Sequence, residues 1–260
     1  MDAFLLAAGL GTRLKPFTDR YPKCLAPVKQ VPLLYLWIKK LQNAEFIDKI
    51  FINLHYKKEE VRAMLREAKY DSRKVILVEE ERLLGTGGSI KNMLSLSSAD
   101  NFFIIHADNY SEAELDIMQR MFEKRKKQDK RIEATVLGFG SKDYESCGFM
   151  MTDETSVLRN FIEKPVREVQ GVANAAIFAC TRDLLRELVV DNESFDFSAE
   201  CLPKMTGRAV VYETGKLHID IGSMERLIQA NKSSTANIDD VALKGDWYEN
   251  YKSQVRSFLL

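Results

Sequence analysis

The sequence lacks several features that mark large classes of protein. Its 38 basic and 38 acidic residues give a net charge of zero, so no excess of positive charge favours nucleic acid or an anionic membrane surface. No apolar run approaches the roughly 20 residues that cross a bilayer. Met1-Asp2 leads directly into an apolar run, which leaves no room for a signal peptide. We therefore expect a cytoplasmic protein with no nucleic-acid partner and no membrane partner.

Metal-binding cysteine patterns are also missing. The four cysteines show no CxxC spacing and no nearby histidine, and they are Cys24, Cys147, Cys180 and Cys201. A structural zinc site needs such clustered ligands. We expect reduced thiols with structural roles.

Two common nucleotide-binding motifs are absent as well. Gly9-Leu10-Gly11 follows an apolar run, but the dinucleotide fingerprint requires a third glycine that opens a helix. Here Pro16 stands where that helix would continue, and no Walker A sequence occurs anywhere in the chain. By themselves, the two glycines indicate only a tight exit from a strand.

Apolar runs alternate with helical patterns in the first half of the chain. The predicted strands are Ala3–Leu6, Lys49–Leu54, Lys74–Val78 and Asn101–His106. The predicted helices are Leu33–Ala44, Lys57–Glu67, Gly88–Leu96 and Ser111–Lys130. This alternation predicts an α/β fold with a mostly parallel central sheet flanked by helices. Ligands of such sheets bind at the carboxyl ends of the strands.

The second half follows a different pattern. After a strand at Arg131–Gly138, short pieces predict a small antiparallel insertion, at Gly148–Met151, Val157–Glu163 and Val172–Cys180. A helix at Thr181–Val190, strands at Arg208–Glu213 and Leu217–Ile219, and a helix at Ser223–Asn231 come next. With no obvious linker, we predict one domain over residues 1–260, with a core of about 1–231 and a terminal helix of about 239–258.

Basic residues accompany the glycines of the first turn. Glycine lets backbone N–H groups approach an anion, and successive N–H groups form an anion-binding concavity. Arg13 adds a planar guanidinium suited to phosphate, and Lys23 adds a mobile point charge. The combination predicts an enzyme that binds a nucleoside triphosphate.

The same region resembles the signature of the sugar-1-phosphate nucleotidyltransferases, the nucleotide-sugar pyrophosphorylases. Leu6–Thr18 reads LAAGLGTRLKPFT, and Pro22–Val28 reads PKCLAPV. The resemblance implies a Rossmann-like nucleotidyltransferase fold with a sugar-binding insertion. It implies catalytic roles for Arg13, on the β- and γ-phosphates, and for Lys23, on the α-phosphate. The implied nucleotide-binding residues of this motif are Leu6, Ala7, Ala8, Gly9, Gly11 and Thr12.

Further parts of the family pattern recur in order up to about Asn231. LGTGG at Leu84–Gly88 resembles the loop that contacts the nucleobase, which implies binding roles for Gly85, Thr86 and Gly87. HADN at His106–Asn109 and DIGS at Asp220–Ser223 resemble the two metal-binding segments, which implies Mg²⁺ on Asp108 and Asp220. EKP at Glu163–Pro165 resembles the hairpin that contacts the sugar phosphate. The implied sugar-phosphate residues are Gly148, Glu163, Lys164 and Asn174.

The implied reaction needs no general base. A phosphate monoester has a second pKa of about 6 and is largely dianionic at neutral pH. Its oxygen would attack the α-phosphorus of the triphosphate and release pyrophosphate, so catalysis would consist of positioning and charge stabilisation. Taken singly, Asp108, Asp220 and Lys164 could be ordinary turn or hairpin residues.

The substrates are less sharply indicated. EEERLL at Glu79–Leu84 lacks the glutamine of the thymidylyl branch, and HADN resembles a guanylyltransferase type, so GTP with mannose or heptose 1-phosphate is the first expectation. UTP is an alternative, as is a cytidylyltransferase acting on phosphocholine or another small phosphorylated acceptor. A catalytically silent regulatory subunit is a third. The resemblance also allows a homodimer.

Overall fold

The computed structural model describes residues 1–189, 194–236 and 241–259. The chain divides into two compact units, each made from three separate stretches. Unit 1 comprises Met1–Phe4, Leu84–Ile105 and Ala113–Lys216. Unit 2 comprises Leu5–Leu83, His106–Glu112 and Leu217–Leu260. Whether the chain acts as one domain stays a prediction.

Unit 1 is built on a sheet with the strand order β10-β9-β11-β6-β1, in which β8 pairs with both β11 and β12. The strands are β1 (Asp2–Leu6), β6 (Asn101–His106), β8 (Ala134–Phe139), β9 (Phe149–Thr152), β10 (Leu158–Ile162), β11 (Val172–Thr181) and β12 (Ala209–Thr214). β12 runs parallel to β8, whereas β11 runs antiparallel to β6, β8 and β9. The antiparallel β9–β10 pair confirms the predicted insertion.

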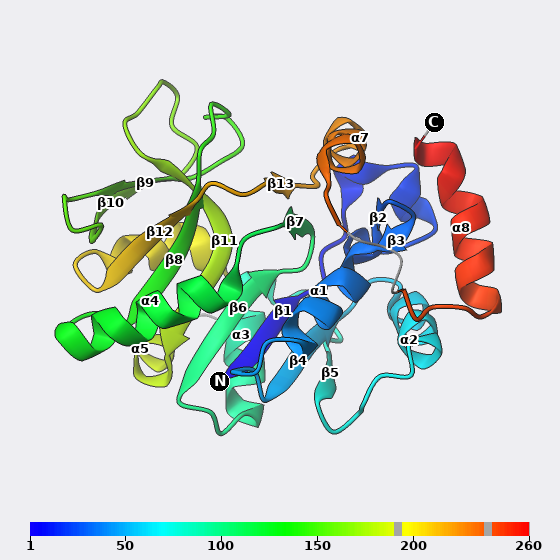
Figure 1. The fold of residues 1–260 in the computed structure, drawn as a ribbon, viewed down its shortest axis with the longest axis horizontal. Coiled ribbons are helices and arrows are strands. Elements are labelled where there is room, and N and C mark those ends of the chain that lie inside the picture. Colours follow the sequence, from blue (N-terminus) through cyan, green and yellow to red (C-terminus); the bar gives the residue numbers. More distant parts are fainter. Residues whose placement is uncertain (190–193, 237–240, 260) are drawn as a thin grey trace. The chain divides into compact units, whose positions relative to one another are not determined.

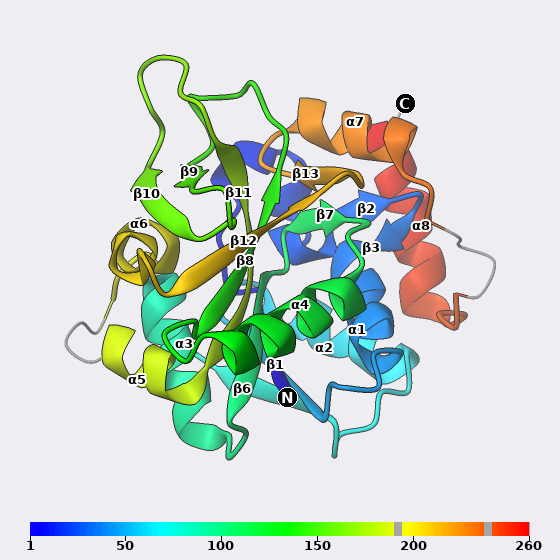
Figure 2. The same ribbon diagram turned by 60° about the vertical axis from the view of Figure 1, so that its left-hand side comes forward.

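The helices of unit 1 are α3 (Gly85–Leu96), α4 (Leu115–Gln128), α5 (Arg182–Leu188) and α6 (Phe197–Cys201). Helix α4 contacts β8, β11 and β12 (Figures 1 and 2). Its buried side chains, Leu115, Met118 and Phe122, follow the helical spacing of three or four residues and form one apolar face. Helix α3 contacts α5 and α6.

Unit 2 contains the end of β1 with β4 (Lys49–Leu54) and β5 (Val75–Glu79), in the order β1-β4-β5. Strands β4 and β5 are parallel. Two short antiparallel ladders join β2 (Pro27–Val28) to β3 (Val31–Pro32) and β7 (Asn109–Ser111) to β13 (His218–Asp220). The helices are α1 (Leu33–Gln42), α2 (Lys58–Glu67), α7 (Met224–Ser233) and α8 (Asp246–Leu259). The predicted α/β fold, with helices flanking a mostly parallel central sheet, is confirmed.

Three predicted helix boundaries are wrong. The helix expected from Ser111 begins at Leu115, because Ser111 pairs with His218 in the β7–β13 ladder. The helix expected from Gly88 begins at Gly85, so the LGTGG glycines form a first helical turn. The helix expected over 239–258 begins at Asp246. Residues 239 and 240 lie outside the described part, and Val190 of another predicted helix does too.

The late start of α8 has a tertiary cause. The N–H groups of Trp247 and Tyr248 donate to the Glu67 carboxylate over 2.7 and 3.1 Å. Backbone donors of a first helical turn lack partners within the helix, and an acidic side chain satisfies them. Glu67 belongs to α2, 180 residues earlier, so local sequence could not reveal this cap.

Helix α8 packs on the signature region through aromatic side chains. Tyr251 is fully buried, its ring lies 5.1 Å from that of Trp247, and its hydroxyl donates to the Leu25 carbonyl over 2.5 Å. Phe258 contacts Phe17 edge to face at 5.8 Å. Figure 1 shows α8 beside α2 and α7, both of which it contacts. The terminal helix therefore supports the turn that carries Lys23.

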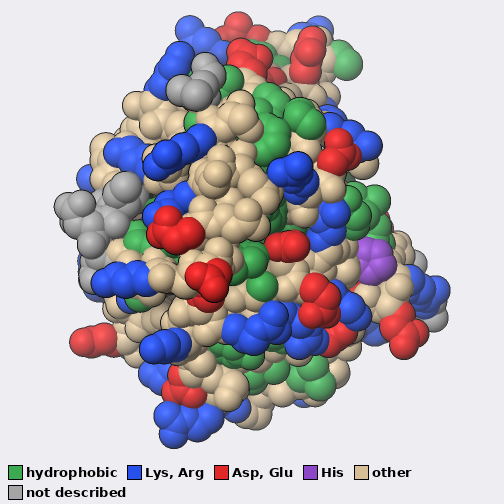
Figure 3. All heavy atoms as spheres, turned by 90° about the vertical axis from the view of Figure 1, so that its right-hand side faces the viewer, with side chains coloured by type: hydrophobic (Ala, Val, Ile, Leu, Met, Phe, Trp, Pro, Cys, Tyr) green, Lys and Arg blue, Asp and Glu red, His purple; other side chains and the backbone are tan. Residues whose placement is uncertain are grey.

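The charges on the surface are mixed, as expected from equal numbers of basic and acidic residues, and the cysteines are free thiols. On the face in Figure 3, Lys and Arg side chains are interspersed with Asp and Glu. Among the described residues, no helix combines the length and the apolar character that a membrane crossing requires. All four cysteines are free thiols, and burial raises the pKa of Cys24 to about 12, which makes its thiol unreactive.

We expect Tyr251→Phe to lower the free energy of unfolding by about 1 to 2 kcal/mol, because the buried Leu25 carbonyl would lose its donor. Urea unfolding measures this difference. Tyr248→Phe is the matched control, since within the described part of the chain the Tyr248 hydroxyl makes no hydrogen bond, and it should leave stability unchanged. Equal stability of Tyr251→Phe and wild type would contradict this role of the hydroxyl.

Candidate functional site

Three predicted site residues converge in unit 2. The Lys23 ammonium donates to Asp108 Oδ2 over 2.6 Å and to Asp220 Oδ1 over 3.3 Å. The Lys23 side chain is only 11% exposed, whereas those of Asp108 and Asp220 are 30% and 48% exposed. The structure thus brings together a predicted phosphate ligand and both predicted metal ligands.

The β7–β13 ladder places the two carboxylates. Asp220 ends β13 and pairs with Asn109, the residue that follows Asp108 (Figure 1). The Ile221 N–H donates to the Asp108 carbonyl over 3.3 Å, and the Ala107 N–H donates to the Leu6 carbonyl over 3.0 Å. The aspartates therefore lie on neighbouring backbone segments close to the end of β1.

Helix α1 fixes the same ladder from its other side. The Trp37 indole N–H donates to the Asn109 carbonyl over 2.7 Å, and the Lys40 ammonium donates to the Ser111 carbonyl over 3.1 Å. Both side chains belong to one helix face, at the spacing of three residues that places helical neighbours together.

Opposite charges keep Lys23 and Asp108 ionised. Burial is the largest influence on Lys23 and opposes its charge, but Asp108 and Asp220 outweigh it, so the pKa of Lys23 is raised. Burial likewise opposes the charge of Asp108, but Lys23 and His106 outweigh it and hold the pKa of Asp108 below its usual value. The Lys23 ammonium and the Asp108 carboxylate therefore stabilise each other's charged forms.

The glycine turn leads into this cluster. Gly11 has φ +63°, a conformation that side chains disfavour, and a Cβ there would lie 2.7 Å from Lys23 Cβ and 2.9 Å from Thr18 Cγ2. Gly9 and Thr12 are exposed, as is Arg13. Since a Cβ on Gly222 would lie 3.2 Å from Asp220 Oδ2 and 3.4 Å from Arg13 Nη2, the guanidinium lies near the cluster.

The first part of the motif is buried and internally bonded. Leu6, Ala7 and Ala8 are at most 8% exposed. The Ala7 N–H donates to Asn53 Oδ1 over 2.7 Å, and Asn53 Nδ2 donates to Glu80 Oε1 over 2.9 Å. Asn53 and Glu80 thus support the turn, and the sequence analysis missed both. An asparagine within the apolar run of β4 was the available signal, because a buried polar side chain needs partners.

The carboxylate pair fits magnesium. In the part of the chain that the structure describes, no group of three or more His, Cys, Asp or Glu side chains gathers as a protein-only metal site. Magnesium usually binds one or two carboxylates and completes its shell with water and substrate phosphates. Asp108 and Asp220, which converge on one ammonium, are such a pair. The role of Mg²⁺ itself stays a prediction.

The predicted base-contacting residues lie in unit 1 and have structural partners there. The Gly87 N–H donates to the Phe195 carbonyl over 3.0 Å, and a Cβ on Gly87 would lie 2.1 Å from the Phe195 ring. Thr86 Oγ1 accepts from the Phe197 N–H over 2.7 Å. A Cβ on Gly85 would lie 2.5 Å from the Phe195 carbonyl oxygen. Their packing against Phe195–Phe197 was not foreseen.

The predicted sugar-phosphate residues also lie in unit 1. A Cβ on Gly148 would lie 2.4 Å from Phe161 Cζ and 2.6 Å from Glu163 Oε2, so this glycine leaves room for both side chains. Lys164 Nζ is 3.7 Å from Glu163 Oε1. Asn174 Nδ2 donates to Ser198 Oγ over 3.3 Å. Partial burial raises the pKa of Glu163, Lys164 opposes this, and Asp196 adds to it. Asp196 and Ser198 were not predicted.

Comparison with known proteins identifies the family. The sequence model described as "Nucleotidyl transferase" matches residues 2–237. The chain belongs to the nucleotidyl transferase family. The sequence resemblance is therefore confirmed, and the fold is that of this family's solved structures.

Two curated relatives show how far the similarity extends. A D-glycero-alpha-D-manno-heptose 1-phosphate guanylyltransferase of Campylobacter jejuni is 27% identical over 227 residues, 86% of this chain and 96% of the relative. A mannose-1-phosphate guanyltransferase of Sulfolobus acidocaldarius, itself described as putative, is 27% identical over 226 residues. That match covers 85% of this chain and 60% of the relative, so the chain spans about three fifths of its length.

A solved structure matches over a similar range. HddC from Yersinia pseudotuberculosis, complexed with GMP-PN, superposes with a TM-score of 0.72 at 26% identity. The match covers 89% of this chain and 98% of HddC.

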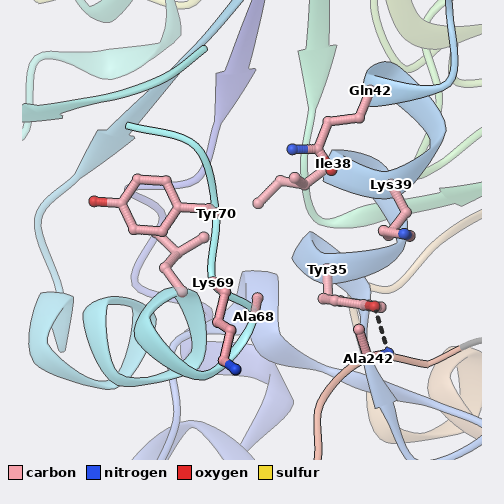
Figure 4. A pocket seen from close by; sticks show the side chains of 9 residues that line it. Tyr35, Ile38, Lys39, Gln42, Ala68, Lys69, Tyr70 and Ala242 are labelled. Atoms are coloured by element: carbon pink, nitrogen blue, oxygen red, sulfur yellow. Dashed lines mark hydrogen bonds between the residues drawn. The ribbon is translucent and has the colours of Figure 1, made fainter. Parts of the chain in front are cut away.

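A small pocket of this nucleotidyltransferase lies in unit 2. It is lined by α1, the end of α2 and Ala242, with Tyr35, Lys39 and Lys69 among its side chains (Figure 4). The Tyr35 hydroxyl accepts from the Ala242 N–H over 2.8 Å. None of the predicted catalytic, nucleotide, sugar or metal residues lines this pocket.

We expect Gly87→Ala to destabilise the protein by about 1 to 3 kcal/mol, because the new methyl group would overlap the Phe195 ring. Helix propensity alone predicts the opposite sign, since alanine is favoured over glycine within helices. Chemical unfolding distinguishes the two. Gly140→Ala, where a Cβ would meet nothing within 4 Å, is the control. A stabilised Gly87→Ala protein would disprove close packing on Phe195.

We expect His218 to make the protein sensitive to mild acid. Burial, with a contribution from Lys40, lowers the pKa of His218 to about 3, against about 6.5 for a free histidine. Between these values the unfolded chain binds a proton that the folded protein does not, so stability falls as pH drops below 6.5. The slope contributed is at most about 1.4 kcal/mol per pH unit.

Urea unfolding between pH 7 and 5 tests this. The free energy of unfolding should fall less steeply for His218→Gln than for wild type. His55→Gln, at a partly exposed histidine, is the control and should keep the wild-type slope. Parallel slopes for wild type and His218→Gln would show that His218 is not the group responsible.

Proposed function

We propose that this nucleotidyltransferase transfers a nucleoside monophosphate from a nucleoside triphosphate to a sugar 1-phosphate and releases pyrophosphate. We further propose GTP as the donor and mannose 1-phosphate or a heptose 1-phosphate as the acceptor. The observation that carries the proposal is the convergence of Lys23, Asp108 and Asp220 beside the glycine turn. The activities for which the Campylobacter and Sulfolobus relatives are named support the choice of base and sugar.

The residues of unit 2 match the electrostatic problem of this reaction. Two anionic substrates must approach each other, and negative charge develops on the departing pyrophosphate. Arg13 offers a guanidinium for the β- and γ-phosphates, and Lys23 offers an ammonium for the α-phosphate. Arg13 is exposed to solvent, whereas the buried Lys23 ammonium lies beside Asp108. The acceptor phosphate is its own nucleophile, so no residue has to remove a proton.

Asp108 and Asp220 are the residues that would hold Mg²⁺, which, when bound, supplies positive charge to phosphate oxygens. In unit 1, Glu163 and Asn174 present oxygen and nitrogen atoms that suit sugar hydroxyls, and Lys164 presents a charge that suits the sugar phosphate. Gly85, Thr86 and Gly87 remain our candidates for contacts to the base.

A substrate matrix tests the proposal. Pyrophosphate release is measured for the four ribonucleoside triphosphates and dTTP against a panel of sugar 1-phosphates and phosphocholine, with Mg²⁺. Strong turnover with GTP and mannose or heptose 1-phosphate is expected. Turnover with UTP in place of GTP would show that the donor is UTP. Turnover with CTP and phosphocholine would show that the acceptor is not a sugar 1-phosphate. If the folded protein releases no pyrophosphate with any pair of substrates, the catalytically silent regulatory subunit is favoured.

We expect Asp108→Asn to lower kcat by about 100-fold or more at saturating Mg²⁺, because the cation would lose a charged ligand. Steady-state pyrophosphate release measures the effect on whichever substrate pair proves active. Asp116→Asn, at an exposed aspartate paired with Arg120, is the matched control and should retain activity. Unchanged kcat in folded Asp108→Asn would remove this carboxylate from the metal site.

A further inference from the structure

The Lys23 ammonium lies where the two predicted metal ligands converge. Its nitrogen is 2.6 Å from Asp108 Oδ2 and 3.3 Å from Asp220 Oδ1. Magnesium binds carboxylate oxygen at about 2.0 to 2.1 Å, so a cation shared by these two oxygens would lie directly against the ammonium that already contacts both. Two cations in contact repel each other strongly, so the ammonium in this place opposes binding of the metal.

The protein supplies few other ligands at this place. Among the residues that the structure describes, the pair is not part of a group of three or more His, Cys, Asp or Glu side chains. A divalent cation that arrives alone would therefore gain two carboxylates while it displaces a well-placed positive charge. A cation that arrives on triphosphate oxygens brings further ligands and also offers the displaced ammonium a new anionic partner.

We propose that Lys23 and a divalent cation bind the Asp108–Asp220 pair in turn, so that Lys23 excludes the cation until a nucleotide delivers it. The nucleotide part rests on the proposed function, whereas the exclusion rests only on the contacts of Lys23. The exchange leaves the carboxylates paired with positive charge before and after cation entry. The long, flexible lysine stem allows the ammonium to move to a phosphate. In this proposal Lys23 has two roles: it keeps the cation off the carboxylate pair before the nucleotide binds, and it binds a phosphate afterwards.

Titration of the 260-residue chain with Mn²⁺, in the absence of nucleotide, tests the exclusion without any turnover. Free Mn²⁺ is counted by its electron paramagnetic resonance signal. Wild type should bind weakly at this site, and Lys23→Gln should bind at least about tenfold more tightly, because the competing buried charge is gone. Adding Asp220→Asn to Lys23→Gln should abolish the gain, which assigns it to this pair.

Lys58→Gln is the matched control. Lys58 also pairs with a carboxylate, Glu79, but its side chain is 45% exposed, so Mn²⁺ binding should equal that of wild type. A folded Lys23→Gln protein with unchanged Mn²⁺ affinity would overturn the proposal.

A second measurement avoids the substitution, in case Lys23→Gln leaves two unpaired carboxylates and folds poorly. In wild-type protein, saturating Mn²⁺ should expose the Lys23 amine and accelerate its reductive methylation, measured by mass spectrometry relative to Lys58. An unchanged Lys23 rate at saturation would overturn the exchange.

The two proposals fail separately. If no substrate pair is turned over but Lys23→Gln binds Mn²⁺ more tightly, the exchange is supported and the proposed activity is contradicted. If turnover is robust but wild type and Lys23→Gln bind Mn²⁺ equally, the proposed activity is supported and the exchange is contradicted.

Discussion

A buried ammonium held between two carboxylates is the interaction around which unit 2 is arranged. Leaving the Lys23 ammonium without its partners would place an unbalanced charge in a poorly hydrated place, which is costly. The surrounding elements therefore fix all three. Gly11 makes room for the Lys23 side chain, the β7–β13 ladder aligns the aspartates, and Trp37 anchors that ladder to α1. The chemistry expected of the family begins from this charge cluster.

The glycine turn illustrates how scaffold and site depend on each other. Its first residues are buried, and Asn53 binds the Ala7 amide, so this part of the motif is a rigid base. Its later residues, Thr12 and Arg13, are exposed to solvent. Helix α8 stabilises the following segment through Tyr251 and Leu25. One short motif thus combines a fixed support with side chains that are free to meet a phosphate.

In unit 1, the residues predicted to bind the base and Asn174, which is predicted to bind the sugar, contact one segment of the chain. The sequence did not predict these contacts. Phe195 packs on Gly85 and Gly87, the backbone of Phe197 bonds to Thr86, and Ser198 bonds to Asn174. The functional and packing interpretations of these glycines are compatible. A backbone that must come close to Phe195 needs glycine whether or not it also contacts a base.

Sequence alone determined the α/β class, most element positions, the family and the identity of the residues in the charge cluster. Apolar periodicity reports burial and hence strands and helices, and a long motif reports a site that tolerates few residue types. The predicted helix boundaries were wrong where a distant residue determines them. Glu67 of α2 caps the start of α8, and Ser111 pairs with His218 in a strand instead of starting a helix. The support from Asn53 and Glu80, and the packing of Phe195 on α3, were likewise invisible. Only the tertiary structure placed the Lys23 ammonium between Asp108 and Asp220, because residues 85 and 197 positions apart meet through folding and not through any local pattern.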